Sequence, residues 1–176
     1  MISCSITASF SPVKLSDKDA LAALPFDGTI SVGDKVTEQL GVIGEKIELA
    51  EYERLEAPMV TSYIHMGNRA GVIVGLNKAS DAFVVGGKDV AMQIAAMKPV
   101  AVDEKGVSAD IIQKEIEIGK ELARQEGKAE EMLEKIALGK LNKFYKENTL
   151  LPQAFVKDNK LSVADYLKTF DKELTV

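Results

Sequence analysis

Few residues in this chain could do chemistry on their own. The 176 residues include one histidine, His65, and one cysteine, Cys4. A serine or cysteine nucleophile needs a base within reach to activate it. Ser62 and His65 are close in sequence, but strand alternation places them on opposite faces, so they cannot form a dyad there. A pair of Cys4 with His65 has no support from the sequence pattern, and no Cys or His spacing is typical of a zinc site.

A glycine pair followed by lysine, Gly86-Gly87-Lys88, invites comparison with phosphate-binding loops. Such a loop needs another glycine five residues before the second one, and Ser or Thr directly after the lysine. Ala82 and Asp89 occupy those two positions. We therefore interpret the pair as a glycine-rich entry to a helix. The sequence predicts a protein that is not an enzyme and that binds no cofactor and no metal.

The composition is that of a soluble globular protein, with 46% apolar and 28% charged residues. The length suits one domain, or one domain with an appendage. A net charge of −5 argues against direct nucleic-acid binding, because neutralising phosphates needs a basic surface. No apolar run approaches the length of a membrane span. A single cysteine fits a reducing compartment, so we expect a cytoplasmic protein.

Residues 108–150 predict two helices folded back on one another as an antiparallel coiled coil. Ser108 is a suitable N-cap, and Gly127 can supply the left-handed stop between the helices. So short a break forces the two helices to lie antiparallel, with their apolar stripes in contact. The expected stripe of the first helix is Ile111, Ile118 and Leu122, flanked by Ile112 and Ile116; that of the second is Leu133, Ala137, Leu141 and Phe144, with Ile136 beside it. Periodicity alone leaves open whether the pair is a brace or a docking arm.

The flanking segments predict a mixed core. We expect a poorly ordered leader at 1–19, an α+β core at 20–107, and a return to the core at 151–176 that ends in a helix. Within these ranges the patterns predict helices at Val32–Lys46 and Gly87–Met97, strand-like stretches at 46–55 and 100–103, a β-hairpin at 59–76, and a last helix opened by a capping box of Ser162 and Asp165. The predicted fold class is α+β: a small antiparallel β-sheet packed with helices, with an inserted antiparallel helical hairpin.

Several segments together resemble the C-terminal half of bacterial elongation factor Ts. They are SYIHMGNRAGVIVGL, DVAMQIAAMKP, SADIIQKE, EEMLEKIALGKLNKFYKENTLLPQAFVKD and LSVADYLK, in that order. The resemblance covers roughly residues 20–172 and implies that 20–107 belongs to the dimerisation domain of that family. It also implies a guanine nucleotide exchange factor that acts in translation by binding elongation factor Tu.

The resemblance implies where the partner contacts lie. His65 falls on the histidine that touches the third domain of elongation factor Tu, and Tyr63 shares its strand face. Phe155 and Val156 fall on the Phe-Val that follows the coiled coil, near the same contact. Lys157 comes next, where some relatives have an apolar residue. From strand spacing alone, a half-buried His65 satisfied by its neighbours is the competing interpretation.

Two features of the family do not occur in the 176 residues. They are the N-terminal helical module and the Thr-Asp-Phe-Val segment that disturbs the magnesium and phosphate site of elongation factor Tu. We expect a fragment, a divergent short form or a chain with a displaced start, which binds elongation factor Tu with reduced exchange activity. The alternative is a scaffolding domain, without exchange activity, that uses the helical hairpin. Self-association through an unpaired sheet edge is left open.

Overall fold

The computed structural model describes residues 17–65 and 70–176. The chain divides into two compact units, whose described parts are residues 17–54 and residues 55–65 with 70–176. Most of the predicted leader and the expected turn at Gly67-Asn68 therefore lie outside the described residues. The first helix, α1, begins at Lys18, within the predicted leader 1–19.

The smaller unit holds two short helices, α1 (Lys18–Ala22) and α2 (Val32–Ile43). Ser31 and Asp34 form a capping box at the start of α2, because the Ser31 side chain accepts from the Asp34 N–H and the Asp34 side chain accepts from the Ser31 N–H. The helix ends before the predicted Lys46, since Gly44 adopts a left-handed conformation with φ 74°. No residue of either helix is buried.

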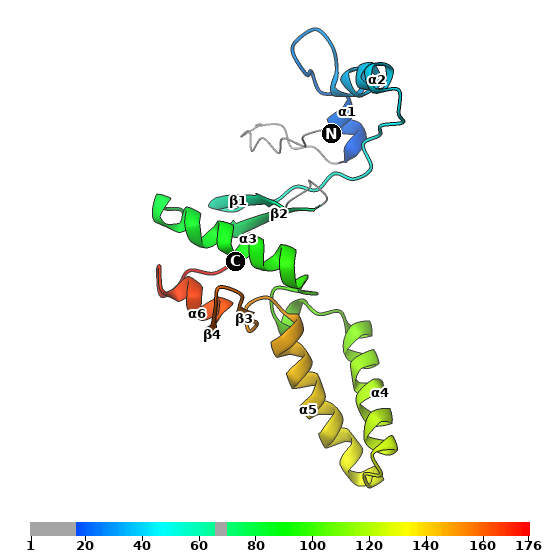
Figure 1. Cartoon of the computed structure of the whole chain (residues 1–176), viewed down its shortest axis with the longest axis vertical. Coiled ribbons are helices and arrows are strands. Elements are labelled where there is room, and N and C mark those ends of the chain that lie inside the picture. The colour runs from blue at the N-terminus through cyan, green and yellow to red at the C-terminus, as the bar shows by residue number, and fades with distance from the viewer. Residues whose placement is uncertain (1–16, 66–69) are drawn as a thin grey trace. The chain divides into compact units, whose positions relative to one another are not determined.

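The larger unit has three layers (Figure 1). The first is an antiparallel hairpin of β1 (Met59–Ile64) and β2 (Gly71–Leu76), in which Thr61 faces Val74. The second is helix α3 (Val84–Met97), entered through a 3-10 turn at Asp81–Phe83. The third combines α6 (Val163–Lys168) with the short strands β3 (Ala154–Phe155) and β4 (Asp158–Ser162). The predicted α+β class is confirmed, although the strands among residues 55–65 and 70–176 form two separate two-stranded sheets.

Helix α3 lies very close to both neighbouring layers. A Cβ on Gly87 would stand 2.5 Å from the Thr61 hydroxyl oxygen, and one on Gly86 would stand 3.1 Å from the Phe170 ring. Only glycine permits such an approach, so the glycine pair serves helix packing. The core formed around α3 contains Val74, Leu76, Phe83, Val90, Ala91, Leu150, Phe155, Val163, Leu167 and Leu174.

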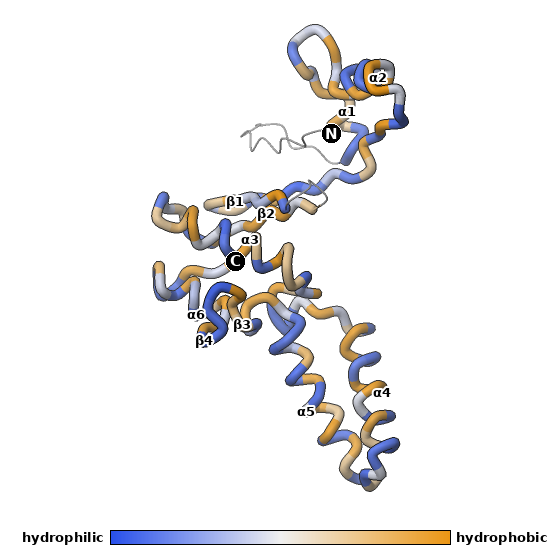
Figure 2. The backbone as a smooth tube through the Cα atoms, in the orientation of Figure 1, coloured by the Kyte–Doolittle hydropathy of each residue, from blue (hydrophilic) through white to orange (hydrophobic). Residues whose placement is uncertain are grey.

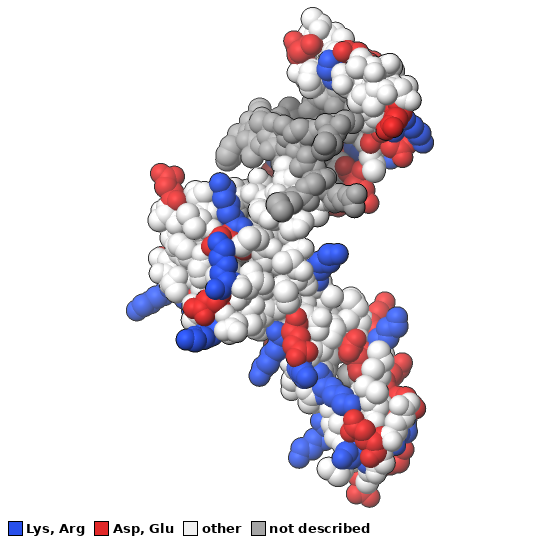
Figure 3. Space-filling view, viewed as in Figure 1, with Lys and Arg blue, Asp and Glu red and all other residues white. Residues whose placement is uncertain are grey.

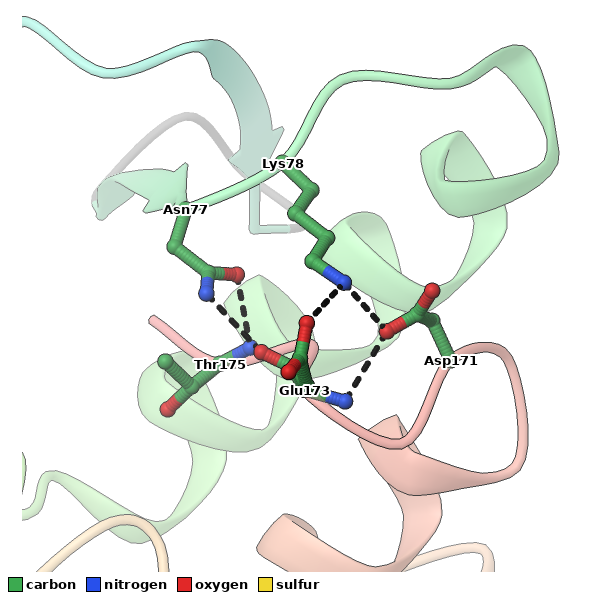
Figure 4. Close-up of polar contacts among 5 residues, drawn as sticks. All are labelled: Asn77, Lys78, Asp171, Glu173 and Thr175. Atoms are coloured by element: carbon green, nitrogen blue, oxygen red, sulfur yellow. Dashed lines mark hydrogen bonds and ion pairs between the residues drawn. The ribbon is translucent and has the colours of Figure 1, made fainter.

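The C-terminal residues are fastened to the end of β2 (Figure 4). The Asn77 side chain donates to the Glu173 carbonyl and accepts from the Thr175 N–H. The Lys78 ammonium lies 2.8 Å from a carboxylate oxygen of Asp171 and 2.8 Å from one of Glu173. The hydrogen bond from Lys78 lowers the pKa of the Asp171 carboxyl, and the two carboxylates raise the pKa of the Lys78 ammonium. These contacts keep Leu174 buried in the core.

The predicted helical hairpin is confirmed as α4 (Ala109–Gln125) and α5 (Glu130–Asn148). The Ser108 side chain caps α4, and Gly127 between the helices is left-handed with φ 72°. Apolar and polar stretches alternate along both helices (Figure 2), and charges of both signs are interspersed over them (Figure 3). Ion pairs such as Lys120 with Glu134 and Arg124 with Glu130 join the two helices.

The seam of the hairpin corrects one prediction. The α5 stripe faces its partner as expected, with Leu133, Ala137 and Leu141 buried. On α4, however, Ile118 and Leu122 are 48% and 44% exposed, whereas Gly119 and Ala123 are buried. The predicted stripe is therefore wrong at Ile118 and Leu122, whereas Ile111, Ile112 and Ile116 are half-buried. The reason is close approach at one point of the seam: a Cβ on Gly119 would stand 3.0 Å from the Ala137 Cα, so small residues occupy this part of the contact.

Two predicted strands are wrong. Residues 46–55 form neither helix nor strand. In the segment 100–103, a single parallel bridge joins Ala101 to Thr149, and the N–H groups of Leu150 and Leu151 donate to the carbonyls of Ala101 and Val102. This segment closes the base of the helical hairpin and does not extend a sheet.

The two glycines of the hairpin give a matched test. Gly119→Ala places a methyl group against the backbone of α5 and should destabilise the chain by about 1–2 kcal/mol. Gly139→Ala lies in open space on α5 and should stabilise it by about 0.5–1 kcal/mol through helix propensity. Urea unfolding measures the free energy of unfolding of both variants. Equal stabilisation by the two substitutions would contradict the close contact between Gly119 and Ala137.

Candidate protein-interaction site

The first predicted contact lies at the end of β1. Strand alternation puts Tyr63 and His65 on one face, and the Tyr63 hydroxyl lies 3.3 Å from the His65 Nδ1. The His65 N–H donates to the Ala70 carbonyl, which continues the hairpin beyond β1. Tyr63 packs against the core from a half-buried position, whereas His65 is exposed. The pair thus presents an imidazole to solvent from a strand end that is anchored by an aromatic ring.

The second predicted contact is a turn between β3 and β4. Phe155 pairs with Asp158, so Val156 and Lys157 are the two residues at its tip. The Val156 side chain is 45% exposed, and the Lys157 side chain is 52% exposed. An apolar and a cationic group therefore lie next to each other on a protruding turn, a combination suited to a protein surface.

Phe155 is not on the surface. Its side chain is 2% exposed and stacks on the Tyr166 ring, with 4.0 Å between the ring centroids. Tyr166 in turn meets Phe170 edge-on. The structure therefore places Phe155 in the core, directly beneath the turn that carries Val156.

Lys157 is held by a half-buried carboxylate of α3. The Lys157 ammonium lies 2.7 Å from the Asp89 Oδ1, and the Tyr166 hydroxyl donates to the Asp89 Oδ2 at 2.7 Å. Burial, together with the Asp89 carboxylate, raises the pKa of the Tyr166 phenol, so this hydroxyl stays a donor at neutral pH. Asp89 therefore fixes the direction of the Lys157 side chain.

Gln93, one helical turn beyond Asp89, contacts the same turn from within the core. Its amide is fully buried and bonds to residues 153, 154 and 156. The prediction from sequence missed both Asp89 and Gln93. A signal existed for Gln93, because it is a polar residue between Val90 and Ile94 on the apolar face of the predicted helix.

The two predicted contacts come from different layers. Strand β1 and the β3–β4 turn lie on opposite sides of α3 in Figure 1. Both pack on one hydrophobic core, since Phe155 belongs to it and Tyr63 packs against it. Within residues 17–65 and 70–176, no group of three or more His, Cys, Asp or Glu could hold a metal ion. No helix in this part of the chain is long and apolar enough to cross a membrane.

Comparison with known proteins gives a consistent match. The model of a family described as elongation factor TS matches residues 3–176. The elongation factor Ts of Christiangramia forsetii is 55% identical over 161 residues, which are 92% of this chain and 58% of that protein. That of Amoebophilus asiaticus is 51% identical over 89% of this chain and 56% of its own length. That of Cytophaga hutchinsonii is 49% identical over 93% of this chain and 59% of its own length. The chain thus spans less than two thirds of the length of these curated relatives.

Substitution by alanine should separate the role of Phe155, at the end of β3, from that of Val156, in the turn. Phe155→Ala removes a buried, stacked ring and should destabilise the chain by about 3–5 kcal/mol. Val156→Ala trims an exposed side chain and should change stability by about 0.5 kcal/mol or less. Thermal and urea unfolding measure the difference. Similar losses for both would show that Val156 is part of the core in solution.

Proposed function

Because the chain belongs to the elongation factor Ts family, we propose that it binds elongation factor Tu and takes part in the exchange of GDP for GTP on that protein. This activity is non-enzymatic, needs no cofactor and involves no direct nucleic-acid contact. We also propose the cytoplasm as its location, as expected from the sequence. The observation that carries the proposal is the solvent-facing turn of Val156 and Lys157, which is supported from below by the core.

The proposed contact surface has two parts. The Val156–Lys157 turn supplies an apolar side chain and a cation, and the Tyr63–His65 pair supplies an imidazole at a strand end. Phe155 contributes by supporting the turn, since its ring is buried. Both parts are anchored to the packed core, so little conformational freedom is lost when a partner docks.

Exchange activity follows from thermodynamic linkage. A partner that binds the nucleotide-free state of elongation factor Tu more tightly than the nucleotide-bound state weakens nucleotide binding by the same factor. A tenfold effect requires about 1.4 kcal/mol of differential contact energy. The 176 residues do not contain the Thr-Asp-Phe-Val segment to which the family resemblance assigns this differential contact. We therefore propose that this chain docks on elongation factor Tu but exchanges its nucleotide slowly.

One observation favours a second function. The helical hairpin leaves Ile118, Leu122, Met132 and Leu138 between 44% and 51% exposed. Exposed large apolar side chains mark a contact surface where they form one contiguous patch, whereas single ones are ordinary. A scaffolding protein that holds a different partner through the hairpin would use these residues and would not need the Val156–Lys157 turn. Self-association also stays a prediction.

Substitution of His65 tests the docking surface. His65→Ala should raise the Kd for elongation factor Tu about tenfold, in line with the loss of one interface contact. The melting temperature should stay within a degree or two, because the side chain is exposed. Isothermal calorimetry and thermal unfolding give the two values, and Asn142→Ala, an exposed polar residue on α5, serves as control. If affinity and stability fall by equal amounts, His65 supports the fold and is not a contact residue. If the unsubstituted chain does not bind elongation factor Tu, the result favours the scaffolding function.

Release of labelled GDP from elongation factor Tu tests the exchange step. The 176-residue chain should accelerate release less than about tenfold at saturation, because it lacks most of the differential contact. The elongation factor Ts of Christiangramia forsetii provides the reference rate under the same conditions. Equal acceleration by the two proteins would show that residues within this chain discriminate between the nucleotide states of elongation factor Tu.

A further inference from the structure

The turn at Val156–Lys157 lacks the usual means of holding its shape. A two-residue hairpin turn is normally stabilised by positive φ angles at one or both central residues. Among the described residues other than glycine, only Lys98 has a positive φ, so neither Val156 nor Lys157 has one. The flanking ladder is also weak: it has two residue pairs, with a register shift between Ala154 and Phe155. Beyond these pairs, the Val163 N–H donates to the Gln153 carbonyl at the base of the hairpin, so the turn itself depends on support from other side chains.

The amide of Gln93 supplies that support. The Gln93 Oε1 accepts from the Val156 N–H at 2.8 Å, and the Gln93 Nε2 donates to the Ala154 carbonyl at 3.1 Å. A backbone N–H can only donate and a carbonyl can only accept, so these two bonds fix the amide in one orientation. The side chain thus bridges the backbone on both sides of Phe155. It is fully buried, so water does not compete for either bond.

A second buried glutamine holds the first in place. Gln93 also donates to the Gln153 Oε1 at 3.1 Å, and the Gln153 Nε2 donates to the Glu147 carbonyl at 2.8 Å. Glu147 lies in the last turn of α5, so a chain of hydrogen bonds runs from the base of the helical hairpin to the Val156 N–H. Each buried amide has partners for its polar atoms, which is the condition under which such a network makes a structure more rigid.

We propose that Gln93 is a positioning residue for docking: it fixes the backbone of Val156, so that this side chain is presented to the partner in one orientation. The inference rests on the proposed function, in which the Val156–Lys157 turn contacts elongation factor Tu. Asp89, at i−4 on the same face of α3, does the same for the Lys157 side chain. One face of α3 thereby sets the geometry of both exposed residues. Gln93 itself does not reach the surface.

The test replaces Gln93 with methionine, which has a similar size but no amide. Gln93→Met should accelerate hydrogen exchange at the Val156 amide at least about tenfold, because the N–H loses its acceptor. It should also raise the Kd for elongation factor Tu about tenfold, because the turn must then be ordered on binding. The matched control is Gln113→Met, at an exposed glutamine of α4 that pairs with Glu117; it should change neither quantity.

A double-mutant cycle with Val156→Ala distinguishes positioning from general damage to the fold. If Gln93 acts through Val156, Gln93→Met should weaken binding by less than about twofold once Val156 is alanine. Full additivity of the two substitutions would overturn the inference. Rapid exchange of the Val156 amide in the unsubstituted chain would also overturn it, and this measurement does not depend on how any variant folds. If the unsubstituted chain does not bind elongation factor Tu, both the proposed function and the docking role fail, while the exchange data still decide whether Gln93 holds the turn.

Discussion

The close packing of α3 is the constraint on which the larger unit depends. This helix is covered on one side by the β1–β2 hairpin and on the other by α6. Both neighbours lie so close to Gly86 and Gly87 that a Cβ at either position would collide with them. Thr61 illustrates the cost of this arrangement, because its buried hydroxyl lies beside Gly87 and has no hydrogen-bond partner among residues 17–65 and 70–176. A side chain at either glycine would push one layer away, and the core around Val90 and Ala91 would open.

Local signals in the sequence predicted the elements that depend on local chemistry. Ser108 caps α4, and Gly127 is left-handed after its last turn, as expected. At α6 the Ser162 side chain accepts from the Asp165 N–H, which is one of the two bonds of the predicted capping box. The hairpin seam could not be found in this way. Periodicity favoured Ile118 and Leu122, since it weighs side chains by hydrophobicity, whereas the helices meet where Gly119 and Ala137 allow the shortest distance. The strand expected at 46–55 failed for a related reason, because propensity alone does not provide a neighbouring strand.

The candidate site shows the same division. The resemblance predicted contacts in the segments 63–65 and 155–157, but it did not distinguish the side chains that face solvent from those that support them. Phe155 and Val156 are adjacent, yet one is 2% exposed and the other 45%. That difference follows from the stacking of Phe155 on Tyr166, a contact between residues eleven apart in the chain. Gln93 was recognisable only as a polar residue on an apolar helix face, and the bonds that explain it join residues about sixty positions apart.

The placement of the proposed contacts also bears on which residues contribute to docking and which contribute to nucleotide exchange. In the proposed complex, a turn fixed by α3 would offer nearly the same surface before and after binding, so its contact with elongation factor Tu would add affinity without sensing the bound nucleotide. A ligand with equal affinity for two states does not shift the balance between them, however tightly it binds. Rigid docking of this kind would therefore hold elongation factor Tu in place, and a separate group would have to touch the part of elongation factor Tu that changes with the nucleotide. In such an arrangement, the residues of this chain set the affinity, and the discrimination between nucleotide states comes from outside the Val156–Lys157 turn.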